Sequence, residues 1–220
     1  MRGTPYADRG EAGRELAARL HRYRDVSGLI VLGLPRGGVP VAAEVAAVLD
    51  APLDVLVARK LGLPSQSEVA MGAIAAVAGE IVTVTNPHVL RTLTDASSRS
   101  SGAFARVEER ERVELARRQR EYRGDRPPLR LEGATVMLVD DGLATGATMR
   151  AAITAVRAVN PAWVVAAVPV GARDSCREIE AMADDLECAW VPEPFWAVGQ
   201  AYVRFDQTTD AEVKALLRGA

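Results

Sequence analysis

The stretch from Val136 to Thr148, VMLVDDGLATGAT, joins four apolar residues, two aspartates and a loop of small residues. The apolar run predicts a strand over Thr135 to Val139 that is buried on both faces of a parallel sheet. Small residues and hydroxyls follow in the loop from Ala144 to Thr148, which leads into a predicted helix. Such a loop binds phosphate through successive amides and the positive end of the helix. The alternative is a tight turn in which Asp141 or Thr148 only caps the helix.

Further strands and helices alternate along the chain. This alternation predicts an α/β fold with a mostly parallel, twisted sheet flanked by helices. Leu61 to Glu68 has a loop-like composition. The other predicted strands are Leu29 to Leu34, Leu53 to Ala58, Trp163 to Val168 and Glu187 to Val191, with a hairpin of Ala73 to Val77 and Ile81 to Thr85. The predicted helices are Glu11 to Tyr23, Val39 to Leu49, Phe104 to Tyr122, Thr148 to Val159, Ser175 to Asp184 and Asp210 to Leu217.

Charge and hydropathy exclude several classes of partner. The formal net charge of −2 lacks the broad attraction that non-specific nucleic-acid binding needs. The helix predicted over Phe104 to Tyr122 mixes both signs of charge, which favours a solvated or subunit-bridging surface over a nucleic-acid patch. The N-terminal residues of the chain have no signal-peptide pattern, and no apolar run approaches the ~18 residues of a membrane span. We therefore expect a cytoplasmic protein that binds neither nucleic acid nor membrane.

Two features offer anion and hydroxyl chemistry at strand ends. Asp140 and Asp141 would repel each other unless hydroxyl donors or a metal offset the repulsion. Pro35 to Gly38, after the first strand, places Arg36 beside Gly37 and Gly38. Arginine offers a bidentate fork to phosphate, and glycines let the backbone approach it. Alone, this segment could be a simple turn.

The strand, the acid pair and the Thr-Gly-x-Thr loop together resemble the signature of type I phosphoribosyltransferases. The resemblance implies that Asp140 and Asp141 bind the ribose 2- and 3-hydroxyls of phosphoribosyl pyrophosphate (PRPP). The 5-phosphate would be held by Ala144, Thr145, Gly146, Ala147 and Thr148. The pyrophosphate would be held by Arg36, Gly37 and Gly38. It also implies a mobile loop over Leu61 to Met71, with Lys60 at its base as a catalytic contact to pyrophosphate, although a strand-end lysine is often only solvated.

The reaction implied by this resemblance moves the phosphoribosyl group to a nucleobase or similar nitrogen acceptor and releases pyrophosphate. Mg²⁺ is the implied cofactor, held through substrate and water near Asp140 and Asp141, with no direct protein ligand assigned. A homodimer is implied as well. The acceptor stays unassigned, because Ala144 stands where hypoxanthine and guanine enzymes carry an aspartate. The alternative is a catalytically silent regulator that senses PRPP or a nucleotide.

The resemblance also divides the chain. Residues 26–191 would form the core, with a charged helical insertion at about 86–130, and the chain ends, 1–25 and 192–220, would form a small hood over the acceptor. Three aromatic residues of the tail, Phe195, Trp196 and Tyr202, could stack on a base. They could equally pack a small core of the hood itself.

Overall fold

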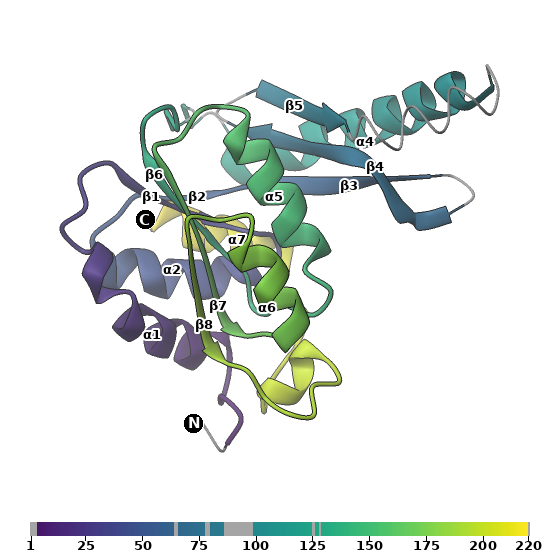
Figure 1. The fold of residues 1–220 in the computed structure, drawn as a ribbon. Helices are drawn as coiled ribbons and strands as arrows, with labels where there is room; N and C mark the ends of the chain where they lie inside the picture. Colours follow the sequence, from purple (N-terminus) through teal and green to yellow (C-terminus); the bar gives the residue numbers. More distant parts are fainter. Residues whose placement is uncertain are drawn as a thin grey trace.

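Five parallel strands form the central sheet, in the order β2-β1-β6-β7-β8 (Figure 1). The computed structural model describes residues 4–63, 66–77, 80–85, 99–124, 126–127 and 129–219. The strands are β1 (Leu29–Gly33), β2 (Leu53–Val55), β6 (Thr135–Val139), β7 (Trp163–Val170) and β8 (Asp185–Trp190). In the three inner strands, β1, β6 and β7, nearly every side chain is buried. Their continuous apolar runs are what a strand covered on both faces requires.

Helices cover both faces of this sheet (Figure 1). On one face lie α1 (Arg9–Arg19) and α2 (Gly38–Leu49), and on the other lie α5 (Ala147–Arg157) and α6 (Arg173–Glu180). Each face has its own cluster of buried apolar side chains. The α/β fold with a mostly parallel sheet flanked by helices is therefore confirmed.

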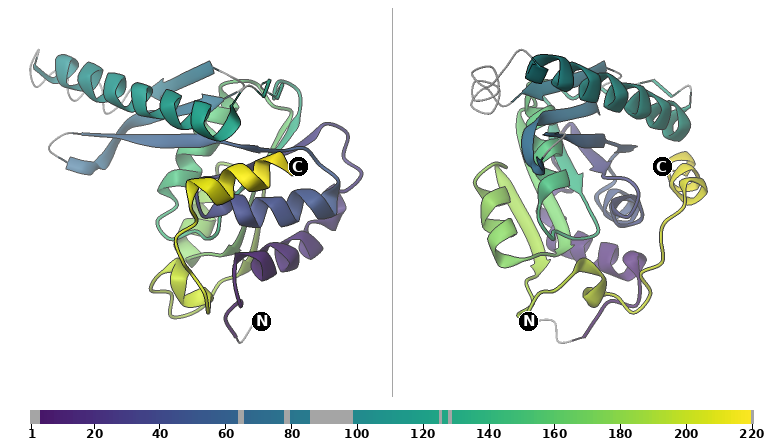
Figure 2. Two further views of the ribbon diagram at one scale, coloured as in Figure 1. Left: turned by 180° about the vertical axis from the view of Figure 1, so that it is seen from behind. Right: turned by 90° about the vertical axis from the view of Figure 1, so that its right-hand side faces the viewer.

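A second sheet of three antiparallel strands projects from the body (Figures 1 and 2). It consists of β3 (Val57–Leu63), β4 (Gln66–Val77) and β5 (Glu80–Thr85). The helix α4 (Arg99–Arg123) packs on β3 and β4, and α5 contacts all three strands. The predicted hairpin is confirmed, since Ala73 pairs with Val84 and Ala76 with Ile81.

The structure corrects two predictions in this region. The strand predicted over Leu53 to Ala58 is divided at Leu56, and its halves belong to different sheets. The predicted loop from Leu61 to Met71 is mostly strand, because β3 runs to Leu63 and β4 begins at Gln66. Register shifts on both sides of Gly62 let the two strands continue past the glycine, and such an irregularity hides the alternating pattern of a strand. Pro64 and Ser65 lie outside the described residues.

The charged helix is confirmed and extends beyond its predicted limits, to Arg99 and Arg123. Two i,i+4 ion pairs form along it, with 3.1 Å between Arg112 and Glu108 and 2.7 Å between Arg118 and Glu114. Such pairs stabilise an isolated helix by about 0.2–0.5 kcal/mol each. The helix is not solvated throughout, because Leu115 and Tyr122 are buried. Residues 86–98 of the predicted insertion lie outside the described part of the chain.

The two ends of the chain lie side by side. Tyr6 forms a parallel bridge with Tyr202, just after the short 3-10 helix η2 (Val198–Ala201). The N-terminal helix ends at Arg19, earlier than predicted, and a 3-10 turn, η1 (His21–Tyr23), follows. The C-terminal helix α7 (Asp210–Arg218) packs on α2 and α4 (Figure 2). The division into a core and a hood stays a prediction.

Candidate functional site

The register of the sheet brings the two predicted anion-binding loops together. β1 and β6 are parallel neighbours, and Gly33 at the end of β1 lies opposite Val139 at the end of β6. The backbone N–H of Leu34 donates to the Val139 carbonyl at 2.9 Å. The loops that follow β1 and β6 therefore begin at the same edge of the sheet, which is where ligands of open α/β proteins bind.

Contact between the two loops depends on two glycines. A Cβ atom at Gly37 would lie 2.0 Å from Asp141 Oδ2, and one at Gly38 would lie 2.6 Å from the Val139 carbonyl oxygen. Real Cβ atoms do not approach other atoms so closely. A residue with any side chain would thus push the loop at Pro35 to Gly38 away from the acid pair. The peptide bond between Pro35 and Arg36 is cis.

The loop from Gly142 to Met149, together with Asp140, lines a cavity of about 120 Å³. A water molecule occupies about 30 Å³ in the liquid, so the cavity can hold a group of the size of a phosphate. The loop backbone enters α5 through Gly146, whose φ of 71° is the left-handed conformation that glycine adopts without strain. All five predicted phosphate-binding residues, Ala144 to Thr148, line this cavity.

Side chains from two helices orient the loop. The Ser175 hydroxyl of α6 donates to the Ala144 carbonyl at 2.5 Å. The Arg150 guanidinium of α5 donates to the Thr145 carbonyl at 2.7 Å and pairs with Glu178 at the same distance. These bonds occupy loop carbonyls, which repel anions, while the first amides of α5 carry the positive end of the helix dipole.

Asp140 and Asp141 form a partly buried acid pair beside this loop. Burial raises the pKa of the Asp140 carboxyl well above its usual value, and the charge of Asp141 raises it further. Burial also raises the pKa of Asp141, against the lowering effect of the Arg9 guanidinium. Asp140 Oδ1 accepts a hydrogen bond from the Asp141 amide at 2.9 Å. The site thus concentrates negative charge where a hydroxyl donor or a cation would be bound.

Sequence reasoning missed Arg9, which forms an ion pair with Asp141. Its Nε and one terminal nitrogen both lie 2.8 Å from Asp141 Oδ2. The residues are 132 positions apart, and Arg9 stands in the first turn of a helix where arginine is usually solvated. No local pattern distinguishes it from the other arginines of α1.

The remaining predicted site residues are placed less directly. The Arg36 guanidinium lies 3.9 Å from Asp210 at the start of α7, and it is about one third exposed. Lys60 lies within β3 and pairs with Ala73, so it belongs to the second sheet and not to the parallel one. The Lys60 side chain is outside the described residues, and its catalytic contact stays a prediction.

The aromatic residues of the tail pack mainly on one another. Tyr6, Tyr202 and Trp190 belong to a third apolar cluster, on which Phe195 also packs. Tyr202 stacks on Phe205 with 4.9 Å between ring centroids. Trp196 differs, because it is 81% exposed. The structure therefore favours packing for Phe195 and Tyr202 and leaves Trp196 available to a ligand.

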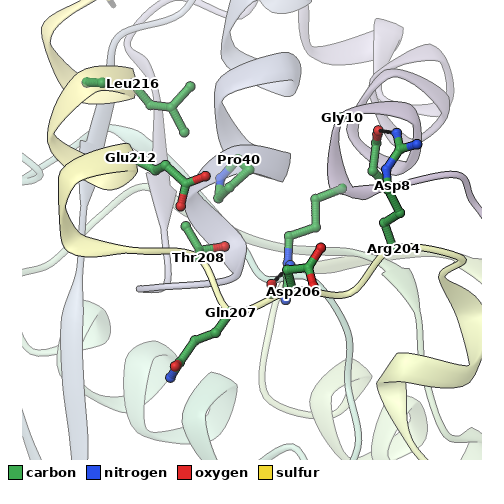
Figure 3. A pocket seen from close by; sticks show the side chains of 11 residues that line it. Asp8, Gly10, Pro40, Arg204, Asp206, Gln207, Thr208, Glu212 and Leu216 are labelled. Carbon is green, nitrogen blue, oxygen red and sulfur yellow. Dashed lines mark hydrogen bonds and ion pairs between the residues drawn. The ribbon is translucent and has the colours of Figure 1, made fainter.

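A second cavity of about 420 Å³ opens between α1, the start of α2, the tail and α7 (Figure 3). Pro40 and Leu216 contribute apolar surface, and Asp8, Arg204 and Glu212 contribute charge. Arg9 also lines this cavity, so one side chain borders both the cavity and the acid pair.

The donor set at the acid pair fits a hard cation. Carboxylate oxygens are the ligands that Mg²⁺ prefers, usually one or two of them together with water and substrate phosphates. Arg9 supplies one positive charge beside the two carboxyl groups, and a bound cation would favour the ionised form of both. Among the described residues, no group of three or more His, Cys, Asp or Glu side chains could hold a metal by itself. No described helix is long and apolar enough to cross a bilayer.

A parallel sheet with an acid pair and a phosphate-sized cavity after β6, facing a glycine loop after β1, is the architecture of the type I phosphoribosyltransferase fold. The model of the phosphoribosyl transferase domain family matches residues 6–203, and the chain belongs to this family. Two Mycobacterium tuberculosis proteins, from strains H37Rv and CDC 1551, are provisionally named as phosphoribosyl transferases. Each is 48% identical over 214 residues, which are 96% of this chain. The chain spans about half the length, 46%, of these relatives.

A solved structure resembles the whole chain. The crystal structure of TT1426 from Thermus thermophilus has a TM-score of 0.85 and 40% sequence identity to this protein. The match covers 97% of this chain and 98% of that one. The second sheet and the long helix α4 are therefore part of the region that the two proteins share.

Proposed function

We propose that this protein transfers the 5-phosphoribosyl group from PRPP to a nucleobase or similar small nitrogen acceptor. The observation that carries the proposal is the phosphate-sized cavity of Ala144 to Thr148, with Asp140 on its wall and the Gly37-Gly38 loop packed against the acid pair. These three elements offer separate positions for the 5-phosphate, the ribose hydroxyls and the pyrophosphate of one donor molecule.

In the proposed reaction the acceptor nitrogen forms a bond to the anomeric carbon as the bond from that carbon to pyrophosphate breaks. The electron pair of the broken bond leaves with pyrophosphate, and the acceptor loses a proton to water. Catalysis would come chiefly from positioning the two reactants and from binding the leaving group. Asp140 and Asp141 would orient the ribose, while Arg36 and the loop of Gly37 and Gly38 would bind the pyrophosphate.

Mg²⁺ fits the proposal as a cofactor that is held mainly by the donor and by water near Asp140 and Asp141. When bound, it would neutralise part of the charge of the leaving pyrophosphate. Lys60 is proposed as a further contact to pyrophosphate, and the homodimer and the cytoplasmic location stay predictions. Sedimentation at low protein concentration tests the dimer, since a strict monomer would contradict it.

Calorimetric titration with PRPP and Mg²⁺ tests the donor site. We expect saturable binding that falls at least tenfold in the variant Asp140→Asn/Asp141→Asn. Asp174→Asn is the matched control, because its carboxylate is exposed on α6 and makes a local pair with Arg177. Absence of binding to the unaltered protein, or equal binding by the double variant, would refute the donor site.

Pyrophosphate release across a panel of nucleobases tests transfer. We expect at least one base to stimulate release, and the stimulating base identifies the acceptor. Tight PRPP binding without release for any nitrogen acceptor would instead support the regulatory alternative. Hydrolysis of PRPP in the absence of base gives the background rate.

A further inference from the structure

Arg9 lies far from the other donor-site residues in the sequence, yet its side chain is only 12% exposed. Two of its guanidinium nitrogens are engaged with Asp141 Oδ2, each at 2.8 Å. The third nitrogen donates to the Asp206 carbonyl at 2.7 Å. All three nitrogens therefore have a partner, and the fork joins the acid pair to the C-terminal tail.

Aromatic rings of the tail hold the same guanidinium from the side. Its central carbon lies 4.1 Å from the Phe205 ring centroid and 5.9 Å from that of Tyr202. The Tyr202 hydroxyl also donates to the Asp141 carbonyl at 2.6 Å. Arginine stacks on aromatic faces while it donates in its own plane, a combination that lysine cannot reproduce.

A neighbouring ion pair fastens the backbone on both sides. Asp8 accepts a hydrogen bond from Arg204 at 2.5 Å (Figure 3). It also caps α1 by accepting a hydrogen bond from the Glu11 amide. The ion pair between Asp8 and Arg204 thus holds the helix that carries Arg9 to the tail that carries Phe205, close to the Arg9 side chain. The position of the Arg9 fork is therefore determined before any ligand arrives.

This geometry has a consequence for Asp141. Both contacts from Arg9 fall on Oδ2, so Oδ1 is the oxygen left for a sugar hydroxyl. The positive charge also opposes the repulsion between the two adjacent carboxylates. Without it, the Asp141 side chain would lose its partner and its defined orientation.

We propose that Arg9 is a positioning residue for the donor sugar, which holds Asp141 so that its free oxygen accepts a ribose hydroxyl. The proposal rests on the proposed function, because it assumes that Asp141 contacts ribose. It also makes the two chain ends part of the donor site, in addition to any role over the acceptor.

The test compares a ligand that has the sugar with ligands that lack it. Ribose 5-phosphate, inorganic phosphate and pyrophosphate are titrated by calorimetry into the unaltered protein, Arg9→Met and Arg9→Lys. Arg14→Met is the control, since Arg14 lies on the same helix, is 59% exposed and pairs with Glu44 at the surface. Circular dichroism tests whether each variant is folded. If Arg9→Met does not fold, Arg9→Lys is compared with the unaltered protein instead.

We expect Arg9→Met to lower the affinity for ribose 5-phosphate about tenfold or more, because a hydrogen bond to a charged group contributes about 1.5–3 kcal/mol. Arg9→Lys should lose less, and both should bind phosphate and pyrophosphate within twofold of the unaltered protein. One of 2-deoxyribose 5-phosphate and 3-deoxyribose 5-phosphate lacks the hydroxyl that donates a hydrogen bond to Asp141. For that ligand, Arg9→Met should bind as tightly as the unaltered protein.

Two results would overturn the role of Arg9. Unchanged binding of ribose 5-phosphate by Arg9→Met would show that Asp141 needs no such partner. Equal weakening of all three ligands would show that Arg9 only stabilises the fold. Failure of the proposed function is distinct, because the unaltered protein would then bind neither PRPP nor ribose 5-phosphate.

Discussion

The phosphate loop and the chain-end cluster flank the same two aspartates but are held in different ways. The phosphate loop, Ala144 to Thr148, is oriented by Arg150 and Ser175, at most 31 positions away. The chain-end cluster, Tyr6, Arg9, Tyr202 and Phe205, joins the two ends of the sequence, and its Arg9 also donates to the Asp206 carbonyl 197 positions away. One side of the site is thus local in the sequence, and the other is assembled only by the fold.

The difference predicts how each side responds to substitution. Damage to the phosphate loop should weaken every ligand that contains a phosphate. Damage to the chain-end cluster should weaken ligands in proportion to their ribose contacts, because this cluster acts through Asp141. The last two predictions below compare the two sides directly, by measuring the binding of inorganic phosphate and of ribose 5-phosphate in parallel.

The largest effect is expected from Gly37→Ala, which displaces Asp141, through which the chain-end cluster acts, and also alters the loop proposed to bind pyrophosphate. Its Cβ would displace the Asp141 carboxylate, which lies 2.0 Å from that position and is already held by Arg9. We expect about a 100-fold loss of PRPP affinity and a loss of about 1–3 kcal/mol in the free energy of unfolding. Calorimetry and urea denaturation measure the two.

Gly219→Ala is the control for this variant, because no atom lies closer than 3.9 Å to the new Cβ. Near-normal PRPP affinity in Gly37→Ala would mean that Asp141 can move without consequence. The chain-end cluster would then have no part in donor binding.

Asp140→Asn should lower PRPP affinity by about 10- to 100-fold and yet stabilise the protein by about 0.5–2 kcal/mol. Burial raises the pKa of Asp140 above its value in the unfolded chain. Between those two pKa values the folded protein binds more protons, so the free energy of unfolding falls as pH rises. The variant removes this contribution, and urea denaturation at several pH values measures it.

A steeper fall of stability with pH in Asp140→Asn than in the unaltered protein would contradict this sign. Asp174→Asn is the matched control for the loss of PRPP affinity, because its carboxylate is exposed on α6.

Gly146→Ala tests the local side through backbone conformation. A left-handed φ of 71° costs a residue with a side chain roughly 1–2 kcal/mol. We expect a similar loss in the free energy of unfolding and a loss of about three- to tenfold in the affinity for inorganic phosphate and ribose 5-phosphate alike. A loss confined to ribose 5-phosphate would show that the loop does not bind phosphate.

The smallest effects come from single hydroxyl groups, one on each side. Ser175→Ala removes the donor to the Ala144 carbonyl, and Tyr202→Phe removes the donor to the Asp141 carbonyl. Because a hydrogen bond contributes a net stabilisation of about 0.5–1.5 kcal/mol, each variant should lose about threefold in ligand affinity. Ser175→Ala should affect phosphate and ribose 5-phosphate equally, whereas Tyr202→Phe should affect only the sugar phosphate. Identical profiles in calorimetry would remove the distinction between the two sides.

Much of the architecture was predictable because buried strands carry their own signal. The apolar runs at Leu29 and Thr135 have no alternation, which indicates a strand with neighbours on both faces, and both strands lie inside the sheet. The second sheet was harder. Gly62 lies within β3 and interrupts its alternating sequence pattern. These residues are extended because β3 pairs with β4, and no local stretch of sequence contains that pairing.

The strand, the acid pair and the phosphate loop were identifiable from adjacent residues alone, because backbone conformation, helix start and charge are local properties there. The meeting of Gly37 with Asp141 depends on the register of β1 against β6, and that of Arg9 with Asp141 depends on the packing of both chain ends. The local sequence around a helical arginine is the same whether its side chain is solvated or packed against a carboxylate. Only the tertiary structure decided which arginine serves the acid pair, since ion pairs form between residues that folding brings within about 3 Å of each other.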